Sequence, residues 1–245
     1  MGETTGSPTA AILVIGDEVL SGKVEEQNAR FLVRELRSLG VAVRRIEVIP
    51  DAREAIAASV RSAHMSFDHV FTAGGIGPTH DDVTVAAVAQ AFAVPVVRDE
   101  ELAGLIRSAS GDRLHPRDLR MADVPEGARL VRGGARWPVV AMDNVYLLPG
   151  VPSILQRQFT AIRDRFQAPP FFSRAIYSAE SEGAIAHVLD QAVADFPSLA
   201  IGSYPHVEAC DHKVMITIDG RDASTVDAAC EQIVTALGAA VVRVA

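Results

Sequence analysis

Residues 72–84 read TAGGIGPTHDDVT and link a strand expected over His69–Ala73 to a helix expected over Asp81–Ala93. The first segment is short, apolar and rich in β-forming residues, whereas the second is long enough for a helix. The three glycines Gly74, Gly75 and Gly77 permit a tight turn with positive φ between the two. We therefore expect a strand, a glycine loop and a helix, in this order.

Segments of the same kinds flank this stretch on both sides. Ala10–Ile15 and Val41–Ile49 are expected as strands, and Asn28–Leu39 and Ala52–Ala63 as helices. Such alternation predicts an α/β fold with three layers, in which helices cover both faces of a mostly parallel sheet. The same reading continues with strands at Pro95–Val97, Val139–Met142 and Val145–Leu148, helices at Glu100–Ser108 and Ser153–Phe166, and a basic loop at Asp112–Arg120.

Two adjacent prolines, Pro169 and Pro170, cannot continue the preceding helix and indicate a domain boundary near residue 168. We expect a disordered tail over residues 1–9, a nucleotide-binding type of domain over 10–167 and a small α+β domain over 168–245. Its pattern is βαββαβ, which is typical of a ferredoxin-like layer. The expected elements are Arg174–Ser178, Gly183–Asp195, Leu199–Ser203, Lys213–Asp219, Ser224–Leu237 and Ala240–Val244.

The composition excludes several classes of partner. A net charge of −8 over 245 residues gives no general attraction to nucleic acid or to anionic lipid. The longest apolar stretch, Val83–Val97, is interrupted and too short to span a bilayer. The first residues lack the pattern of an export signal, and two cysteines give no disulfide framework. We therefore expect a cytoplasmic protein whose partner is a small molecule.

The glycine loop is the strongest candidate for ligand binding. Its backbone can approach a ligand closely, and the helix behind it presents free N–H groups and the positive end of its dipole. Gly74, Gly75 and Gly77, together with Pro78 and Thr79, are therefore expected to hold a phosphate. The alternative is an ordinary tight turn between a strand and a helix, since short glycine patterns are weak signals.

Acidic residues follow the expected strands. Asp82 matches a capping box with Thr79, which would merely secure the helix start. If the ligand is anionic, however, Asp81 and Asp82 require a divalent cation such as Mg²⁺ between them and the phosphate.

The acids that precede the glycine loop in the sequence could likewise have a structural role or belong to the site. Asp17 and Glu18 follow the first strand and are expected as metal ligands, although they could bind a ribose or equally form a solvated turn. Asp51 follows Pro50 and could serve as a turn residue or as a site residue.

A second loop, Leu148–Pro152, follows an apolar strand and opens a helix. Gly150 and Pro152 are its expected ligand contacts, and a purely structural turn is the alternative. Arginines in the exposed loops could form a phosphate-facing rim or be ordinary surface charges, namely Arg117, Arg120, Arg132 and Arg136. His80 lies within the glycine loop, where a surface position is expected.

Taken together, several motifs resemble the MoaB/Mog molybdopterin-binding family in their order and spacing. They are Gly16-Asp17-Glu18, Asn28, Pro50-Asp51, Gly74–Thr84 and Leu148–Pro152. More narrowly, the chain resembles the N-terminal region of CinA-type competence/damage-inducible proteins and the matching region of some FAD synthetases. The resemblance covers residues 10–167, and Ile201–Pro205 suggests that it extends into the small domain.

The resemblance implies function as well as fold. Members of the wider family bind molybdopterin and adenylylate it or insert molybdate, whereas the CinA branch is associated with metal-dependent cleavage of ADP-ribose or FAD-like pyrophosphates. The family's functional acids fall on Asp51 and Asp82. Ile154 replaces the usual glutamate of the CinA branch, and residues 136–144 lack its Ala-Pro-Gly loop. These departures favour the branch related to FAD synthetases.

We therefore expect a metal-dependent dinucleotide pyrophosphatase in which Asp51 and Asp82 are catalytic. Adenylylation of molybdopterin and a non-catalytic module that binds a pterin or nucleotide are the alternatives. By analogy with related folds, a homo-oligomer, either dimer or trimer, is expected.

Overall fold

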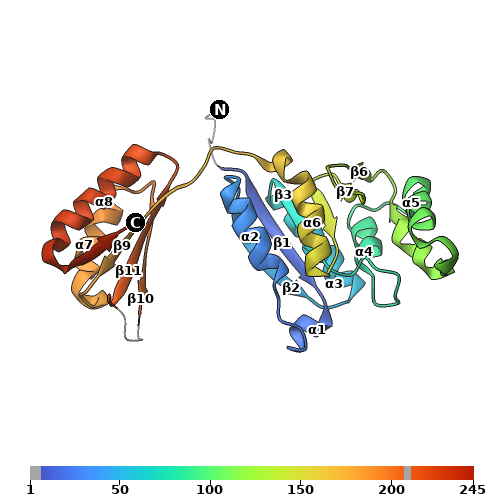
Figure 1. Cartoon of the computed structure of the whole chain (residues 1–245), viewed down its shortest axis with the longest axis horizontal. Coiled ribbons are helices and arrows are strands. Elements are labelled where there is room, and N and C mark those ends of the chain that lie inside the picture. The colour runs from blue at the N-terminus through green and yellow to red at the C-terminus, as the bar shows by residue number, and fades with distance from the viewer. Residues whose placement is uncertain (1–6, 207–210) are drawn as a thin grey trace. The chain divides into compact units, whose positions relative to one another are not determined.

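The computed structural model describes residues 7–206 and 211–245. The chain divides into two compact units, Met1–Ala168 and Pro169–Ala245, and each is described separately (Figure 1). Among the described residues, no helix combines the length and the apolar character needed to cross a membrane.

The first unit is built on a six-stranded sheet with the order β2-β1-β3-β8-β7-β6. The first four of these strands are parallel, whereas β7 runs antiparallel to both of its neighbours. Their bounds are β1 (Thr9–Ile15), β2 (Ala42–Ile49), β3 (His69–Ala73), β6 (Arg129–Val131), β7 (Val139–Met142) and β8 (Val145–Leu148). The sheet is thus mostly parallel, as the alternation of strands and helices predicted.

Strand β1 is buried on both faces because helices cover the sheet on both sides. Ile12 and Val14 pack in a cluster with residues of α2 (Asn28–Ser38) and α6 (Pro152–Ile162). Leu13 and Ile15 point to the opposite face, where α3 (Arg53–Ser66) and α4 (Thr84–Ala91) complete a second cluster. Figure 1 shows α2 and α6 side by side over one face. These three layers confirm the predicted architecture.

A smaller substructure projects between α4 and β6. It contains a two-stranded antiparallel ribbon and its own cluster of buried residues, which includes Leu102, Ile106 and Val124. The segment expected to be a basic loop forms two 3-10 helices instead, and β5 and β6 were not predicted. The elements are β4 (Val96–Arg98), α5 (Glu100–Ser110), η1 (Gly111–Arg113), η2 (Pro116–Ala122) and β5 (Asp123–Pro125).

The structure corrects several predicted boundaries. The helix expected from Asp81 begins at Thr84, so that both acids of this segment lie in the preceding loop. The acidic turn after β1 is a short helix, α1 (Asp17–Leu20). The helix expected to reach Phe166 ends at Ile162 and continues as η3 (Arg163–Phe166).

Pro8 and Thr9, which we expected to be part of a disordered tail, are ordered. Thr9 already belongs to β1, and its N–H and hydroxyl both donate to Asp68 at 2.7 Å. The N–H of Ala42 in β2 donates to the Pro8 carbonyl at 2.8 Å. Backbone pairing thus reaches into the predicted tail, whose residues 1–6 lie outside the described part of the chain.

The second unit has the predicted βαββαβ order and a four-stranded antiparallel sheet, β10-β11-β9-β12. Ile176, Ile216 and Ile218 of its central strands pack in one cluster with residues of both helices. This is the expected ferredoxin-like layer. Its elements are β9 (Phe172–Ser178), α7 (Glu182–Asp195), β10 (Ala200–Pro205), β11 (Val214–Gly220), α8 (Ala223–Leu237), η4 (Gly238–Ala240) and β12 (Val241–Val244).

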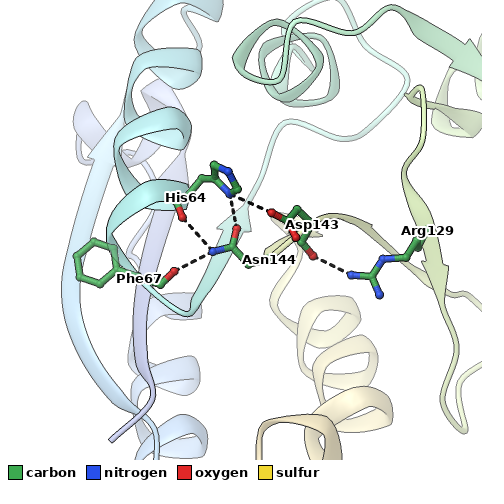
Figure 2. Close-up of polar contacts among 5 residues, drawn as sticks. All are labelled: His64, Phe67, Arg129, Asp143 and Asn144. Atoms are coloured by element: carbon green, nitrogen blue, oxygen red, sulfur yellow. Dashed lines mark hydrogen bonds and ion pairs between the residues drawn. The ribbon is translucent and has the colours of Figure 1, made fainter. Parts of the chain in front are cut away.

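The side chain of Asn144 links the turn between β7 and β8 to the end of α3 (Figure 2). Its Nδ2 donates to the carbonyls of His64 at 3.1 Å and Phe67 at 2.8 Å. Its Oδ1 lies 2.7 Å from His64 Nδ1, which must therefore carry a proton. The Asp143 carbonyl of the same turn accepts a hydrogen bond of 2.8 Å from Arg129 of β6. Asn144 thus fixes α3 against the amino end of β8.

We expect Asn144→Ala to lower the free energy of unfolding of the first unit by about 2 kcal/mol, because two part-buried carbonyls lose their donor. Urea unfolding followed by tryptophan fluorescence measures this, since the single tryptophan, Trp137, lies in this unit. Asp143→Asn is the matched control. It alters only the contact of 3.6 Å between the exposed Asp143 carboxylate and His64 Nδ1, and should change stability by less than about 0.5 kcal/mol. Equal effects of the two substitutions would contradict this role.

Candidate functional site

A cavity of about 660 Å³ opens in the first unit where four parallel strands end. The loops after β1, β2, β3 and β8 all contribute to its lining. Open α/β sheets bind ligands at this edge, because the loops after adjacent strands converge there. The cavity is therefore the candidate site.

The glycine loop after β3 forms the floor of the cavity. A Cβ atom at Gly74 would collide with the Ile15 carbonyl, and one at Gly75 would collide with the Thr84 hydroxyl. Both residues also have positive φ, 115° and 66°. Thr84 Oγ1 donates to the Gly74 carbonyl at 2.9 Å and fixes the loop to the start of α4. Glycine is thus required here by close packing as well as by backbone conformation.

The backbone N–H groups of this loop differ in whether they form hydrogen bonds within the protein. That of Gly74 donates to the Leu148 carbonyl at 3.0 Å, which extends the pairing of β3 with β8. It is therefore not available to a phosphate, and our prediction for this residue was wrong in that respect. The N–H groups of Gly75 and Gly77 form no hydrogen bond with any residue that the structure describes. Both glycines line the cavity, so their N–H groups are the donors that a ligand could use.

Asp82 closes the loop rather than capping the helix. Its Oδ2 accepts hydrogen bonds from the Thr79 N–H at 2.8 Å and from the Thr79 hydroxyl at 2.6 Å. Because α4 begins only at Thr84, the predicted capping box does not form. Thr79 is absent from the cavity lining, whereas Pro78, Asp81 and Asp82 belong to it. Thr79 thus positions Asp82 instead of contacting a ligand.

The loops after β1 and β2 bring further carboxylates to the same cavity. Asp51 and Glu18 line it, but the Asp17 side chain does not. Instead, the Asp17 N–H donates to Asp51 Oδ2 at 2.9 Å. Partial burial raises the pKa of the Asp51 carboxyl, and the surrounding negative charges raise it further, against the lowering effect of this hydrogen bond. Asp17 therefore orients Asp51 through its backbone.

These acids could hold a cation whose coordination is completed by water and by the ligand. Within residues 7–206 and 211–245, no three acidic, histidine or cysteine side chains lie close enough to hold a metal ion together. Mg²⁺ commonly binds through one or two carboxylates, several waters and substrate phosphates. Partial burial, and to a lesser extent the neighbouring carboxylates, raises the pKa of Asp51, and a cation bound beside it would offset both effects.

The loop after β8 forms the side of the cavity next to α6. Gly150 lines the cavity as expected, and Pro149 lines it as well. Pro152, the first residue of α6, does not. The Gly150 carbonyl accepts a hydrogen bond of 2.7 Å from Asn28 Nδ2, which fixes the loop to α2. Asn28 is thus a structural support for this loop.

Among the arginines expected at the rim, two have structural roles. Arg120 donates to the Thr79 carbonyl at 3.0 Å and supports the glycine loop, and Arg132 pairs with Glu101. Neither lines the cavity, and the same holds for Arg117 and Arg136. His80 has a fully exposed side chain, as expected, and approaches Asp81 at 3.7 Å.

Sequence reasoning missed Arg157 of α6, the basic side chain of the cavity lining. Its guanidinium forms no hydrogen bond or ion pair with any described residue. Arg157 lies three positions after Ile154, which also lines the cavity, so both belong to one face of α6. This helical spacing is the signal that could have identified it once the loop before α6 was assigned to the site.

The second missed feature is an apolar wall opposite the acids. It comes from the small substructure and from the residues that precede and begin β7. Local sequence could not place these segments at the cavity, because their position depends on the pairing of β7 with β8. We define the apolar wall as Leu102, Ile106, Met121, Trp137, Pro138 and Val140.

Comparison with known proteins agrees with this geometry. Residues 11–167 match the family model described as "Probable molybdopterin binding domain", and residues 170–245 match the model described as "FAD synthase, middle domain". A protein of Archaeoglobus fulgidus is 34% identical over 90% of this chain and 94% of its own length. A "Probable FAD synthase" of Caenorhabditis elegans is 31% identical over 90% of this chain, which spans 48% of that relative.

A solved structure supports the same assignment for the first unit. The crystal structure of the protein CinA of Thermoplasma acidophilum is 30% identical, with a TM-score of 0.60, over 65% of this chain and 98% of its own. The predicted resemblance to this family is confirmed. The chain therefore belongs to the MoaB/Mog-type family of molybdopterin-binding domains, and it is similar to CinA-like proteins and to FAD synthases.

Proposed function

We propose that the chain is a metal-dependent pyrophosphatase that cleaves dinucleotides of the ADP-ribose or FAD type. One observation carries the proposal. A single cavity combines carboxylates with backbone N–H groups and the Arg157 guanidinium, and these donors have no partner among the residues that the structure describes. Cleavage of a pyrophosphate requires positive groups around its oxygens and a positioned water, and this cavity offers residues for both tasks.

In this proposal, the positive and N–H groups bind the phosphates, and the carboxylates bind the cation and the water. The N–H groups of Gly75 and Gly77 and the guanidinium of Arg157 would bind the pyrophosphate oxygens. Asp51 and Glu18 would hold a divalent cation, with Asp81 nearby. Such a metal, when bound, supplies Lewis acidity and lowers the pKa of a coordinated water. Asp82, oriented by Thr79, would accept a proton from the attacking water.

A second candidate function is adenylyl transfer to molybdopterin, because the matched family is described as binding molybdopterin. The same phosphate contacts could serve it, because both reactions require stabilised charge at an α-phosphorus. The relatives named as FAD synthases favour a flavin dinucleotide among the candidate substrates. The products distinguish the reactions, since hydrolysis releases AMP from a dinucleotide whereas transfer consumes ATP and a pterin. Tight binding without turnover would instead indicate a non-catalytic module.

We expect Asp51→Asn and Asp82→Asn each to lower turnover by about 100-fold or more, because each removes a charge needed by the cation or the water. AMP release from ADP-ribose, FAD and NAD is followed by chromatography with Mg²⁺, Mn²⁺ or Co²⁺, and with a chelator. Asp17→Asn is the control, since that side chain lies outside the cavity lining, and it should stay within about twofold of wild type. Undiminished turnover in either of the first two variants would remove that residue from the mechanism.

Asp51→Asn should also stabilise the metal-free protein at pH 7. The pKa of Asp51 is raised in the folded state, so its ionisation favours unfolding as pH rises above the ordinary value of about 3.9. Asparagine keeps an acceptor for the Asp17 N–H without the charge. Thermal unfolding with chelator should give a higher Tm for the variant at pH 7 and no difference near pH 3. The exposed Asp112 provides the control Asp112→Asn, and a lower Tm for Asp51→Asn at pH 7 would contradict the assignment.

Arg157→Met should weaken binding of inorganic pyrophosphate by about tenfold or more, which is the usual effect of losing a charge-assisted hydrogen bond. Calorimetric titration in the presence of Mg²⁺ measures this effect. Arg34→Met is the matched control, because it removes the same charge from an exposed position on α2 outside the cavity. Equal weakening in both variants would show that only overall charge matters.

A further inference from the structure

We infer that the apolar wall of the cavity is a subsite for the planar heteroaromatic ring of a nucleotide, and that Trp137 provides its flat face. The inference rests on the proposed function, since it assigns the part of the ligand that the phosphate contacts leave unexplained. It concerns residues that lie outside every motif behind the family resemblance.

The apolar wall is one continuous surface. Leu102 and Ile106 of α5 are buried, and Trp137 and Val140 pack against the cluster that they form. Met121 at the end of η2 extends this surface and is 41% exposed. A ligand that covers an exposed apolar side chain in a cavity removes apolar surface from water, and this favours binding. The wall therefore favours an uncharged ligand group.

The order of strands places the apolar wall at one end of the cavity and the acids at the other. Asp51 and Glu18 follow β2 and β1, the glycine loop follows β3 and the Gly150 loop follows β8. Strand β7 comes next, and because it is antiparallel its amino end lies at this edge of the sheet. Trp137 and Pro138 immediately precede that end. A ligand that spans the cavity must therefore have an anionic part and an apolar part.

The loop that carries Trp137 is held in place. A Cβ atom at Gly133 would collide with the Ala161 carbonyl of α6, so this loop packs directly against the helix that also bears Arg157. The Arg136 guanidinium lies 5.9 Å from the centre of the Trp137 ring, and Trp137 is half-buried. Because its surroundings restrain the indole, a ring could stack on it with little loss of side-chain freedom.

A planar heteroaromatic ring fits this surface better than a sugar or a further phosphate. Bases stack on aromatic side chains irrespective of their hydrogen-bonding pattern, whereas phosphate and hydroxyl groups would lose water against an apolar wall. A cavity of about 660 Å³ also exceeds what a pyrophosphate alone would fill. Adenine and the flavin ring share the required chemistry, and the probes below distinguish them.

The test compares four probes in the presence of Mg²⁺, namely AMP, FMN, ribose 5-phosphate and inorganic pyrophosphate. Trp137 is the single tryptophan of the chain, so its fluorescence reports directly on ring stacking. We expect AMP, FMN or both to bind at least about tenfold more tightly than ribose 5-phosphate and to quench this fluorescence. The probe that binds more tightly identifies the preferred ring.

Trp137→Ala should reduce the affinity for the ring-bearing probe by about tenfold, measured by calorimetry, and leave pyrophosphate within about twofold. Met121→Gln, at an exposed position, should act in the same direction even if the first variant folds poorly. Tyr204→Ala removes an exposed aromatic side chain of the second unit and serves as the control.

The inference is overturned if neither AMP nor FMN binds more tightly than ribose 5-phosphate, or if the wall variants weaken pyrophosphate equally. Failure of the proposed function gives a different result. If wild type cleaves no dinucleotide but still prefers the ring-bearing probe, the pyrophosphatase proposal fails and the ring subsite stands. If wild type cleaves a dinucleotide and the KM is unchanged in Trp137→Ala and Met121→Gln, the pyrophosphatase proposal stands and the ring subsite fails.

Discussion

The contact between Gly74 and the end of β1 is the constraint on which the candidate site depends. No side chain fits between this residue and the Ile15 carbonyl, so the glycine loop lies directly against the turn that carries Glu18. The hydrogen bonds from Gly74 to Leu148 and from Thr84 to Gly74 attach the same residue to β8 and α4. A side chain here would separate the acids from the loop that faces them.

This close packing has an electrostatic consequence. It gathers several carboxylates at one end of a cavity, where partial burial and mutual repulsion raise the pKa of Asp51. Such an arrangement destabilises the ligand-free protein and is typical of functional rather than structural acids, which supports our proposal that a cation binds there. Arg157 and the apolar wall complete a cavity with charged and uncharged ends. These two ends are the basis of our proposal that the ligand has both phosphates and a ring.

The sequence was most informative where local pattern and tertiary structure agree. The expected bounds of β3, β7 and β8 are those of the structure, because each is a short apolar run that ends at a turn. The start of α4 was misplaced because Asp82 turns back to Thr79, a local competition between side chain and backbone that periodicity does not register. Gly74 was assigned to phosphate for a similar reason, since the partner of its N–H lies in β8.

By itself, the sequence determined the alternation of strands and helices, the glycine loop and the presence of acids after the strands, because hydrophobic periodicity and glycine content are local properties. Only the tertiary structure decided which of these groups meet. It placed Asp51, Glu18 and Arg157 in one cavity, excluded the side chains of Asp17, Thr79 and Pro152, and brought Trp137 to the opposite end. The order and direction of the strands decide which residues meet in the cavity. Both arise from pairing between segments far apart in the chain.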